Sequence, residues 1–590
     1  GERMDFGKNA RRGGLSNFLR RTAFFYTIGF NVSSSIINLS HLPLIVYPWL
    51  AGKYGYGKTG KAITDAGKLM NAGKTIGKKR KKQTLAGTEV DIDAPKMFGV
   101  EYDFVEGIDT YFIGEIDKKT GETTYVLRKD LKFPNKETET MVKAMQPLVQ
   151  EMKDRDLFTS SYLSAELDVN EMGRKKTLLD ELTGTSAYWF NYMDTRTRQT
   201  TAIANFLLET GLNEPGAKKL TAKELKEAAG NAVYTTQKLN GGTTAETGAR
   251  FAQGDFGSVA LMYKNYGLTV YGNLFEAAKR YYDFRFGSKV DQNTGKKESD
   301  IAFKQLVGIH GAALVVAGAQ AMPLYAVYRI VANLFLGDDE EDADVLARRF
   351  LTEFGYKGPI VALTGIDYAS RASLSELLFQ FNRFNPDANL EEQMWFYFAG
   401  PAGGVAKTFD RAITDFKNGN VERGVEGFMP TAVRNLYRGT VRYPREGALT
   451  RRGDPVYTDW SVGDLAFQAF GFAPSEYTRA NEQKMSLKNI DNAISRERTN
   501  LLRNYYVAVR VGDWEKSQDI MKDIIKFNSR HGLGKAGITA DTIERSMMQH
   551  AKTSTEMWNG VLISSMNRDA LRMKRDEWDD GISLLPDDLL

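Results

Sequence analysis

A glycine- and lysine-rich pattern at residues 52–59 has the composition of a phosphate-binding loop. Its letters, GKYGYGKT, satisfy G-x-x-x-x-G-K-[ST], in which backbone N–H groups and the lysine hold nucleotide phosphates. That chemistry needs a buried strand before the loop and a helix after it. Residues 44–47 could form a short strand, but Pro48 and Trp49 intervene and no βα alternation follows. A nucleoside-triphosphate hydrolase is therefore the weaker alternative, with these candidate residues: Gly52, Gly57, Lys58 and Thr59.

Residue usage argues against most other catalytic centres. The chain has no cysteine, which removes thiolate zinc sites, iron–sulfur clusters, disulfides and cysteine nucleophiles. Its four histidines are far apart in sequence, and G-x-S-x-G is absent. The densest carboxylate run, at 338–344, is typical of a solvated loop. We therefore predict no catalytic residue, no metal site and no cofactor.

Positive charge is concentrated near the N-terminus. Residues 1–82 carry sixteen Lys and Arg against three acids, a net +13, so the total of +5 leaves −8 for the remainder. Such asymmetry is typical of a basic arm that meets nucleic-acid or lipid phosphates, although a solvated linker is the plain alternative. The predicted phosphate contacts end a Gly/Lys-rich segment: Lys74, Lys78, Lys79, Arg80, Lys81 and Lys82.

Two long stretches lack ionic side chains. Residues 22–52 and 305–328 contain no Asp, Glu, Lys or Arg over 31 and 24 residues. Both are long enough to span a bilayer, which needs about 20 apolar residues. Buried core helices are the favoured interpretation, and a protein that inserts in a second state is compatible with it. In the second stretch, Pro323 is expected to kink or end a helix whose small residues form a packing face: Gly308, Ala313, Ala317 and Ala321.

The remaining patterns predict a mainly α, multi-subdomain helical protein with a small β-hairpin insertion. β-Branched and aromatic residues at 110–116 and 123–127 flank a turn, whereas apolar residues recur at helical spacing from about residue 137. We predict five segments. They are an N-terminal helical segment with the basic arm (1–95), a β insertion (96–135), a helical subdomain (136–300), a helical subdomain with the small-residue helix and acidic loop (301–440), and a C-terminal helical subdomain with an acidic tail (441–590).

Three blocks of sequence resemble a region of large polyvalent virion-associated proteins of short-tailed bacteriophages. The first is FFYTIGFNVSSSIINLS at 24–40. The second comprises TTQ at 235–237, ARF at 249–251 and GDFG at 254–257. The third comprises PTAVRNL at 430–436, EGALTRRGDP at 446–455 and AFGFAPSE at 469–476, and continues into a helical hairpin with Gly512 and Asp513 at its bend.

The resemblance implies a non-enzymatic internal or ejection protein that helps deliver the phage genome through the tail and across the host envelope. It implies a place in the virion, in the capsid interior or tail, and in the host periplasm or inner membrane after ejection. The implied partners are portal, tail or internal core proteins, further copies of the chain, phage DNA and the host inner membrane. The family offers no agreed catalytic residues in this region to carry over.

A second phage alternative is the non-catalytic C-terminal region of a giant virion RNA polymerase. The chain begins with Gly1 rather than Met, so we expect a processed product, an excised domain or part of something longer.

Overall fold

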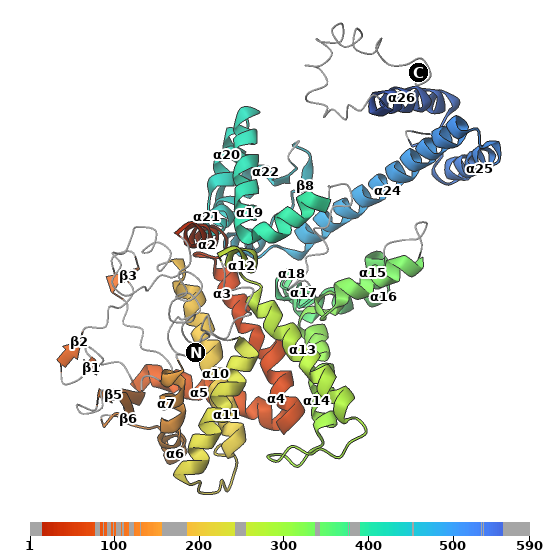
Figure 1. The fold of residues 1–590 in the computed structure, drawn as a ribbon. Helices are drawn as coiled ribbons and strands as arrows, with labels where there is room; N and C mark the ends of the chain where they lie inside the picture. The colour runs from red at the N-terminus through yellow and green to blue at the C-terminus, as the bar shows by residue number, and fades with distance from the viewer. Residues whose placement is uncertain are drawn as a thin grey trace. The chain divides into compact units, whose positions relative to one another are not determined.

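The computed structural model forms two compact units, residues 1–478 and 479–590. Figure 1 shows helices throughout the described chain, as the sequence predicted. The boundary between the units lies within the segment predicted as 441–590. The structure describes residues 14–76, 111–116, 123–129, 131–155, 186–241, 255–336, 343–375, 390–450, 453–532 and 536–558, short strands between 83 and 101, and residues 108, 377 and 534.

The first uncharged stretch forms several short helices instead of one long one. Helix α2 (Gly14–Thr27) ends before Phe30, which adopts a left-handed φ of 57°. Helix α3 (Val32–Leu39) is followed by a π-helical turn (Leu42–Val46), so residues 44–47 do not form the strand that the nucleotide alternative would need. Pro48 does not break the chain there because it lies in the first turn of the next helix, where its missing N–H costs nothing. Two helices complete this part: α4 (Tyr47–Tyr54) and α5 (Tyr56–Ile76).

The predicted β-hairpin is present. Strand β5 (Phe112–Ile116) pairs antiparallel with β6 (Thr123–Leu127), with Ile113 opposite Val126. Among the described residues three more two-stranded antiparallel ladders occur, and none joins into a larger sheet. Their strands are β1 (Gln83–Leu85) with β2 (Thr88–Val90), β3 (Lys96–Met97) with β4 (Val100–Glu101), and β7 (Ala448–Leu449) with β8 (Pro455–Tyr457).

A first core joins the hairpin to the helices that follow it. Apolar residues at helical spacing, such as Met141, Leu148 and Met152, are buried against Phe206 and Val233. The last helix of the group begins at a capping box, in which Thr221 and Glu224 satisfy each other's backbone N–H groups. The helices are α6 (Lys136–Ala144), α7 (Gln146–Asp154), α10 (Tyr188–Thr210) and α11 (Ala222–Asn240).

A second core forms around the second uncharged stretch. Helix α14 (Glu298–Ala317) packs on α4 and on α13 (Asn265–Phe284), and it buries Ile309 and Ala313 beside Trp49. A 3₁₀ turn (Ala319–Ala321) leads into four further helices: α15 (Tyr325–Leu336), α16 (Ala343–Lys357), α17 (Pro359–Thr364) and α18 (Ala369–Ala372).

Helix α19 (Leu390–Lys417) organises the rest of the first unit, where it contacts α2 and α20. It bends at Gly400, which has a positive φ of 57° and is followed by Pro401. The surrounding helices are α12 (Asp255–Ala260), α20 (Val421–Phe428), α21 (Thr431–Tyr437), a π-helical turn (Arg438–Arg442), α22 (Tyr443–Glu446) and α23 (Val462–Ala469).

The described residues of the second unit, up to residue 558, form three helices. Helix α24 (Ser475–Val511), which begins in the first unit, ends at Gly512, whose φ of 78° suits only glycine. Asp513 then caps α25 (Trp514–His531) by accepting a hydrogen bond from the Lys516 amide at 3.0 Å. The bend predicted at residues 512–513 is thereby confirmed. Helix α26 (Ala540–Trp558) is the third of these helices, and the core of the unit contains Leu502, Ile524, Phe527 and Ile538.

Candidate functional site

The 52–59 pattern lies on two consecutive helices. Gly52 is inside α4, and the other candidate residues, Gly57, Lys58 and Thr59, are in the first turn of α5. Between them Gly55, with φ 102°, makes a sharp elbow. The Thr59 amide already donates to the Gly55 carbonyl at 3.1 Å, and the Thr59 side chain is fully buried. This segment therefore lacks both the strand and the open loop that the nucleotide alternative requires.

Gly52 instead lets α4 and α14 approach closely. A Cβ atom at this position would lie 2.7 Å from Gln305 Cγ and 3.2 Å from the Ile301 carbonyl oxygen. Further along the contact, a Cβ on Gly308 would lie 3.1 Å from Pro48 Cβ. Gly308 of the predicted packing face and Gly52 of the nucleotide-loop candidate thus both serve helix packing.

Replacing Gly52 by Ala is expected to lower the free energy of unfolding by about 1–2 kcal/mol, because the crowding outweighs the gain in helix propensity. Gly57→Ala is the matched control, since its Cβ would meet nothing within 4 Å. It should stabilise α5 by about 0.5–1 kcal/mol. Urea denaturation followed by circular dichroism measures both changes, and equal midpoints for the two variants would contradict the packing role.

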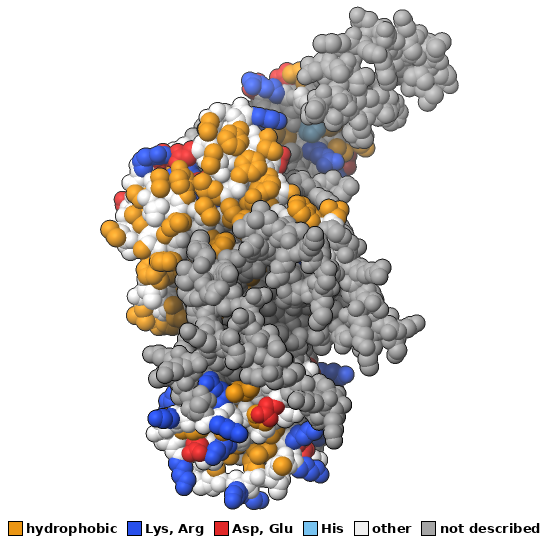
Figure 2. Space-filling view, turned by 90° about the vertical axis from the view of Figure 1, so that its left-hand side faces the viewer, with side chains coloured by type: hydrophobic (Ala, Val, Ile, Leu, Met, Phe, Trp, Pro, Cys, Tyr) orange, Lys and Arg blue, Asp and Glu red, His pale blue; other side chains and the backbone are white. Residues whose placement is uncertain are grey.

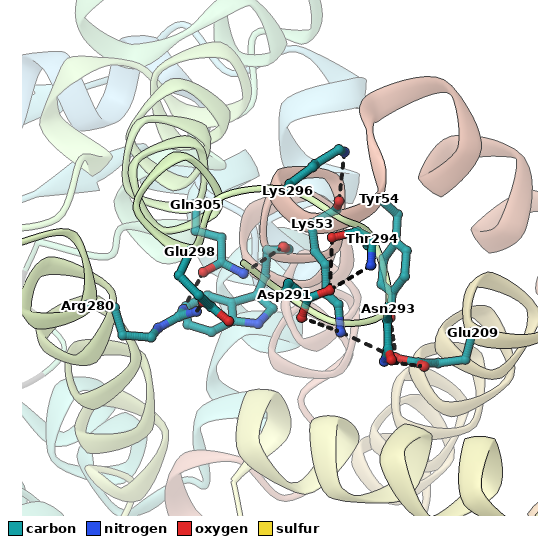
Figure 3. A network of polar contacts seen from close by, with 11 residues as sticks. Lys53, Tyr54, Glu209, Arg280, Asp291, Asn293, Thr294, Lys296, Glu298 and Gln305 are labelled. Atoms are coloured by element: carbon teal, nitrogen blue, oxygen red, sulfur yellow. Dashed lines mark hydrogen bonds and ion pairs between the residues drawn. The ribbon is translucent and has the colours of Figure 1, made fainter. Parts of the chain in front are cut away.

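Figure 3 shows the polar network that surrounds this elbow. Lys53 Nζ lies 3.5 Å from a carboxylate oxygen of Glu209 on α10 and 3.5 Å from one of Asp291, in the turn before α14. The Tyr54 hydroxyl donates to Glu209, and Asn293 Nδ2 donates to its other oxygen at 3.0 Å. Three segments distant in sequence are thus joined at one lysine.

The turn before α14 is itself held in place. Asp291 Oδ1 accepts hydrogen bonds from the amide and the hydroxyl of Thr294, both at 2.8 Å. Lys296 Nζ donates to the Lys53 carbonyl oxygen at 2.8 Å. The turn is therefore bound to Lys53, near the end of α4, through both the side chain and the backbone carbonyl of that lysine.

The other half of the network surrounds Trp49. Gln305 Nε2 donates to the Trp49 carbonyl at 3.1 Å, and Arg280 donates to Gln305 and to Glu298, the latter at 3.3 Å. The Arg280 guanidinium and Lys238 Nζ lie 5.5 and 5.1 Å from the centroid of the Trp49 ring. Both distances suit cation–π attraction.

The pKa values of Tyr54 and Asp291 indicate that this network has a structural role. Burial, reinforced by the charge and hydrogen bond of Glu209, raises the pKa of Tyr54 far above its usual range. Burial alone would raise the pKa of Asp291, but the Thr294 hydrogen bonds and the Lys53 charge outweigh it and lower that pKa. The phenol therefore remains a donor and the carboxylate remains ionised near neutral pH. Neither group is poised to exchange a proton.

His41, a residue type common in catalysis, is inaccessible. Burial, together with the charge of Arg198, lowers the pKa of His41 to about 3, and Nδ1 lies 3.0 Å from the Tyr266 hydroxyl. The ring is thus neutral and enclosed at physiological pH. In the described part of the chain no group of three or more His, Asp or Glu side chains could hold a metal ion.

The predicted phosphate contacts lie almost wholly outside the described residues. Lys74 is near the end of α5, although its side chain is not described. The five others fall in a range that the structure does not describe: Lys78, Lys79, Arg80, Lys81 and Lys82. Their function stays a prediction from charge.

The small-residue helix ends earlier than predicted. Gly318, with φ 77°, terminates α14 after Ala317, five residues before Pro323. Ala313 and Ala317 are fully buried on α14, whereas Ala321 is buried in the 3₁₀ turn and off that helical face. Among the described helices, α14 alone is long and apolar enough to cross a membrane, a criterion that core helices of soluble proteins also meet.

Two of the blocks that carry the phage resemblance meet in a buried polar cluster. A Cβ on Gly471, whose φ is 92°, would lie 2.8 Å from Ser33 Oγ, 2.9 Å from Asn31 Oδ1 and 3.0 Å from Asn435 Nδ2. Ser33 donates to Asn31 Oδ1 at 2.7 Å, and Arg371 donates to Ser33 at 2.7 Å. The one sequence signal was the polar Asn31 and Ser33 within an uncharged stretch.

Comparison with protein-family models, curated proteins and solved structures found no match.

Proposed function

We propose that this chain is a bacteriophage virion protein, an internal or ejection component without catalytic activity that helps deliver the phage genome through the tail and across the host envelope. The three sequence blocks that resemble the phage proteins, and the order in which they occur, support this proposal. The chemistry of the elbow is consistent with it, because the pattern that suggested a nucleotide site lies on packed helices and its Lys53 pairs with Glu209 and Asp291.

The observation that carries the membrane part of the proposal is the two-sided character of α14. One face buries Gln305, Ile309 and Ala313 against the second core, where Gly52 and Gly308 permit close packing. The opposite face exposes apolar side chains to solvent: Phe303, Val307, Leu314 and Val315. Lys304 is the one Asp, Glu, Lys or Arg between residues 301 and 317, so both faces of α14 are mainly apolar. Such a helix gains by moving into lipid, whereas a soluble core helix normally exposes a polar face.

A second apolar surface supports association with other virion proteins or with further copies of the chain. In Figure 2 hydrophobic side chains gather on the face at the level of α19, α20 and α21. The exposed residues on these helices include Ile413, Val421, Val425 and Leu436. Extended apolar patches on a protein surface mark interaction sites.

The basic N-terminal part would contact phage DNA. A net charge of +13 over residues 1–82 suits phosphate neutralisation, which releases counterions and makes affinity fall with salt. In this proposal the chain resides in the capsid interior or tail, and it reaches the host periplasm or inner membrane after ejection.

Val307→Asp is expected to reduce leakage of a dye from phospholipid vesicles severalfold. The carboxylate would sit near the middle of α14, where an acidic side chain in lipid costs about 2.5–3.5 kcal/mol. Val307 is 52% exposed, so the change should leave the soluble fold intact. Dye release at equal protein concentration measures the effect.

The matched control is Val507→Asp on α24, since Val507 is 48% exposed. It should leak vesicles like the unmodified chain, and thermal unfolding should confirm that both variants remain folded. If neither the unmodified chain nor the control releases dye, or if both variants behave alike, the membrane step is refuted. Finding the chain beside portal or tail proteins in purified particles would support the virion assignment independently.

A further inference from the structure

A polar cavity opens within the second unit, between α24 and α26. Its volume is about 460 Å³, which is in the range of small-molecule sites. Hydroxyl, amide and guanidinium groups dominate its wall, which consists of Arg498, Thr499, Leu502, Asp541, Thr542, Arg545, Ser546, Gln549 and His550. The last six of these residues, from Asp541 to His550, belong to α26 and recur at i, i+4 spacing. One face of α26 therefore forms one side of the cavity.

The cavity has one uncompensated positive charge. Arg545 pairs with Asp541 on the same helix, with Nε 3.0 Å and Nη2 2.6 Å from the carboxylate oxygens. Arg498 has no hydrogen bond or ion pair with any described residue, and its Nε is buried. Its neighbour Glu497 is engaged with Arg530 at 3.0 Å. The two arginines and one aspartate of the wall together carry a net charge of +1.

Such a wall favours an oxyanion. A buried guanidinium N–H without an acceptor is costly, and a planar guanidinium can bind two oxygens of one phosphate. Thr542 and Ser546 add hydroxyl groups around the same space, whereas the Thr499 hydroxyl donates to the Ser495 carbonyl oxygen at 2.7 Å. We propose that this cavity binds the phosphate group of a small soluble ligand, with Arg498 as its principal contact.

Equilibrium dialysis of the full chain against radiolabelled inorganic phosphate tests the assignment. The unmodified chain should bind one phosphate per chain. Arg498→Gln should weaken binding by roughly tenfold or more, because it removes a charge-assisted contact. Arg498→Lys, which retains the charge but not the fork, should bind with intermediate affinity.

Arg503→Gln is the matched control, since Arg503 is exposed on the same helix and does not line the cavity. It should bind phosphate like the unmodified chain. Should Arg498→Gln fail to fold, as judged by thermal unfolding, the pair Thr542→Val and Ser546→Ala supplies the same test. Absence of saturable binding, or equal affinity in Arg498→Gln, overturns the proposal. Displacement of the phosphate by a DNA oligonucleotide at lower concentration overturns the assignment to a small ligand.

Discussion

Asp367→Asn is expected to lower the free energy of unfolding by about 3–5 kcal/mol, because it removes one charge of a buried ion pair. Lys357 Nζ lies 3.5 Å from Asp367 Oδ2, and the two side chains are 1% and 0% exposed. Asparagine can still accept the hydrogen bond that Asp367 receives from the Ser370 amide at 3.1 Å. The loss therefore reports the missing charge of the Lys357–Asp367 pair, and urea denaturation measures it.

Two comparisons isolate the charge. The double variant Lys357→Met with Asp367→Leu removes both charges and should recover most of the lost stability, because well-packed apolar groups often replace a buried pair without cost. Asp519→Asn breaks an ion pair with Lys522, at 2.8 Å, that is exposed to solvent. It should leave the denaturation midpoint unchanged. A double variant as unstable as the single one would show that packing, and not charge, sets the loss.

Gly318→Ala should destabilise the protein by about 3 kcal/mol or more, since two costs combine. With φ 77° and ψ 178°, Gly318 occupies a backbone region that is essentially restricted to glycine. A Cβ there would also lie 2.2 Å from the Tyr356 carbonyl oxygen and 2.5 Å from the Gly358 amide nitrogen. Because these neighbours are backbone atoms, no side chain can rotate away to make room.

The matched change on the same helix is Gly311→Ala, whose Cβ would meet nothing within 4 Å. It should raise the free energy of unfolding by about 0.5–1 kcal/mol through helix propensity alone. Opposite shifts of the thermal midpoint are expected for the two variants. A loss of stability in both would mean that α14 tolerates no added methyl group, whatever the local space.

Local patterns predicted the element types well. Alternating β-branched residues around residues 113 and 126 marked the hairpin, and Gly512 with Asp513 marked the bend between α24 and α25. Helix ends were less predictable, because several nearby residues in the sequence can each end a helix. Pro323 was expected to end α14, but Gly318 does so first by contacting Gly358, a neighbour 40 residues away that periodicity does not reveal.

Site prediction failed where chemistry depends on contacts between distant segments. The residues at 52–59 match a phosphate loop in letters, yet Gly52 is small because Gln305 crosses there. Lys53 matters through Glu209 and Asp291, which no local motif links to it. Arg498 drew no attention in sequence, since an arginine in an amphipathic helix is ordinary until its lack of a partner is seen.

The setting of Trp49 gives the elbow an optical probe of its own. The indole is 5% exposed and lies between Lys238 of α11 and Arg280 of α13. Water entering between α4 and these helices would shift its fluorescence emission to longer wavelength before the far-ultraviolet dichroism of the helices is lost. In a variant that keeps Trp49 and has its six other tryptophans replaced by phenylalanine, a quencher such as iodide would report the opening of this one junction while the remainder of the chain keeps its helices.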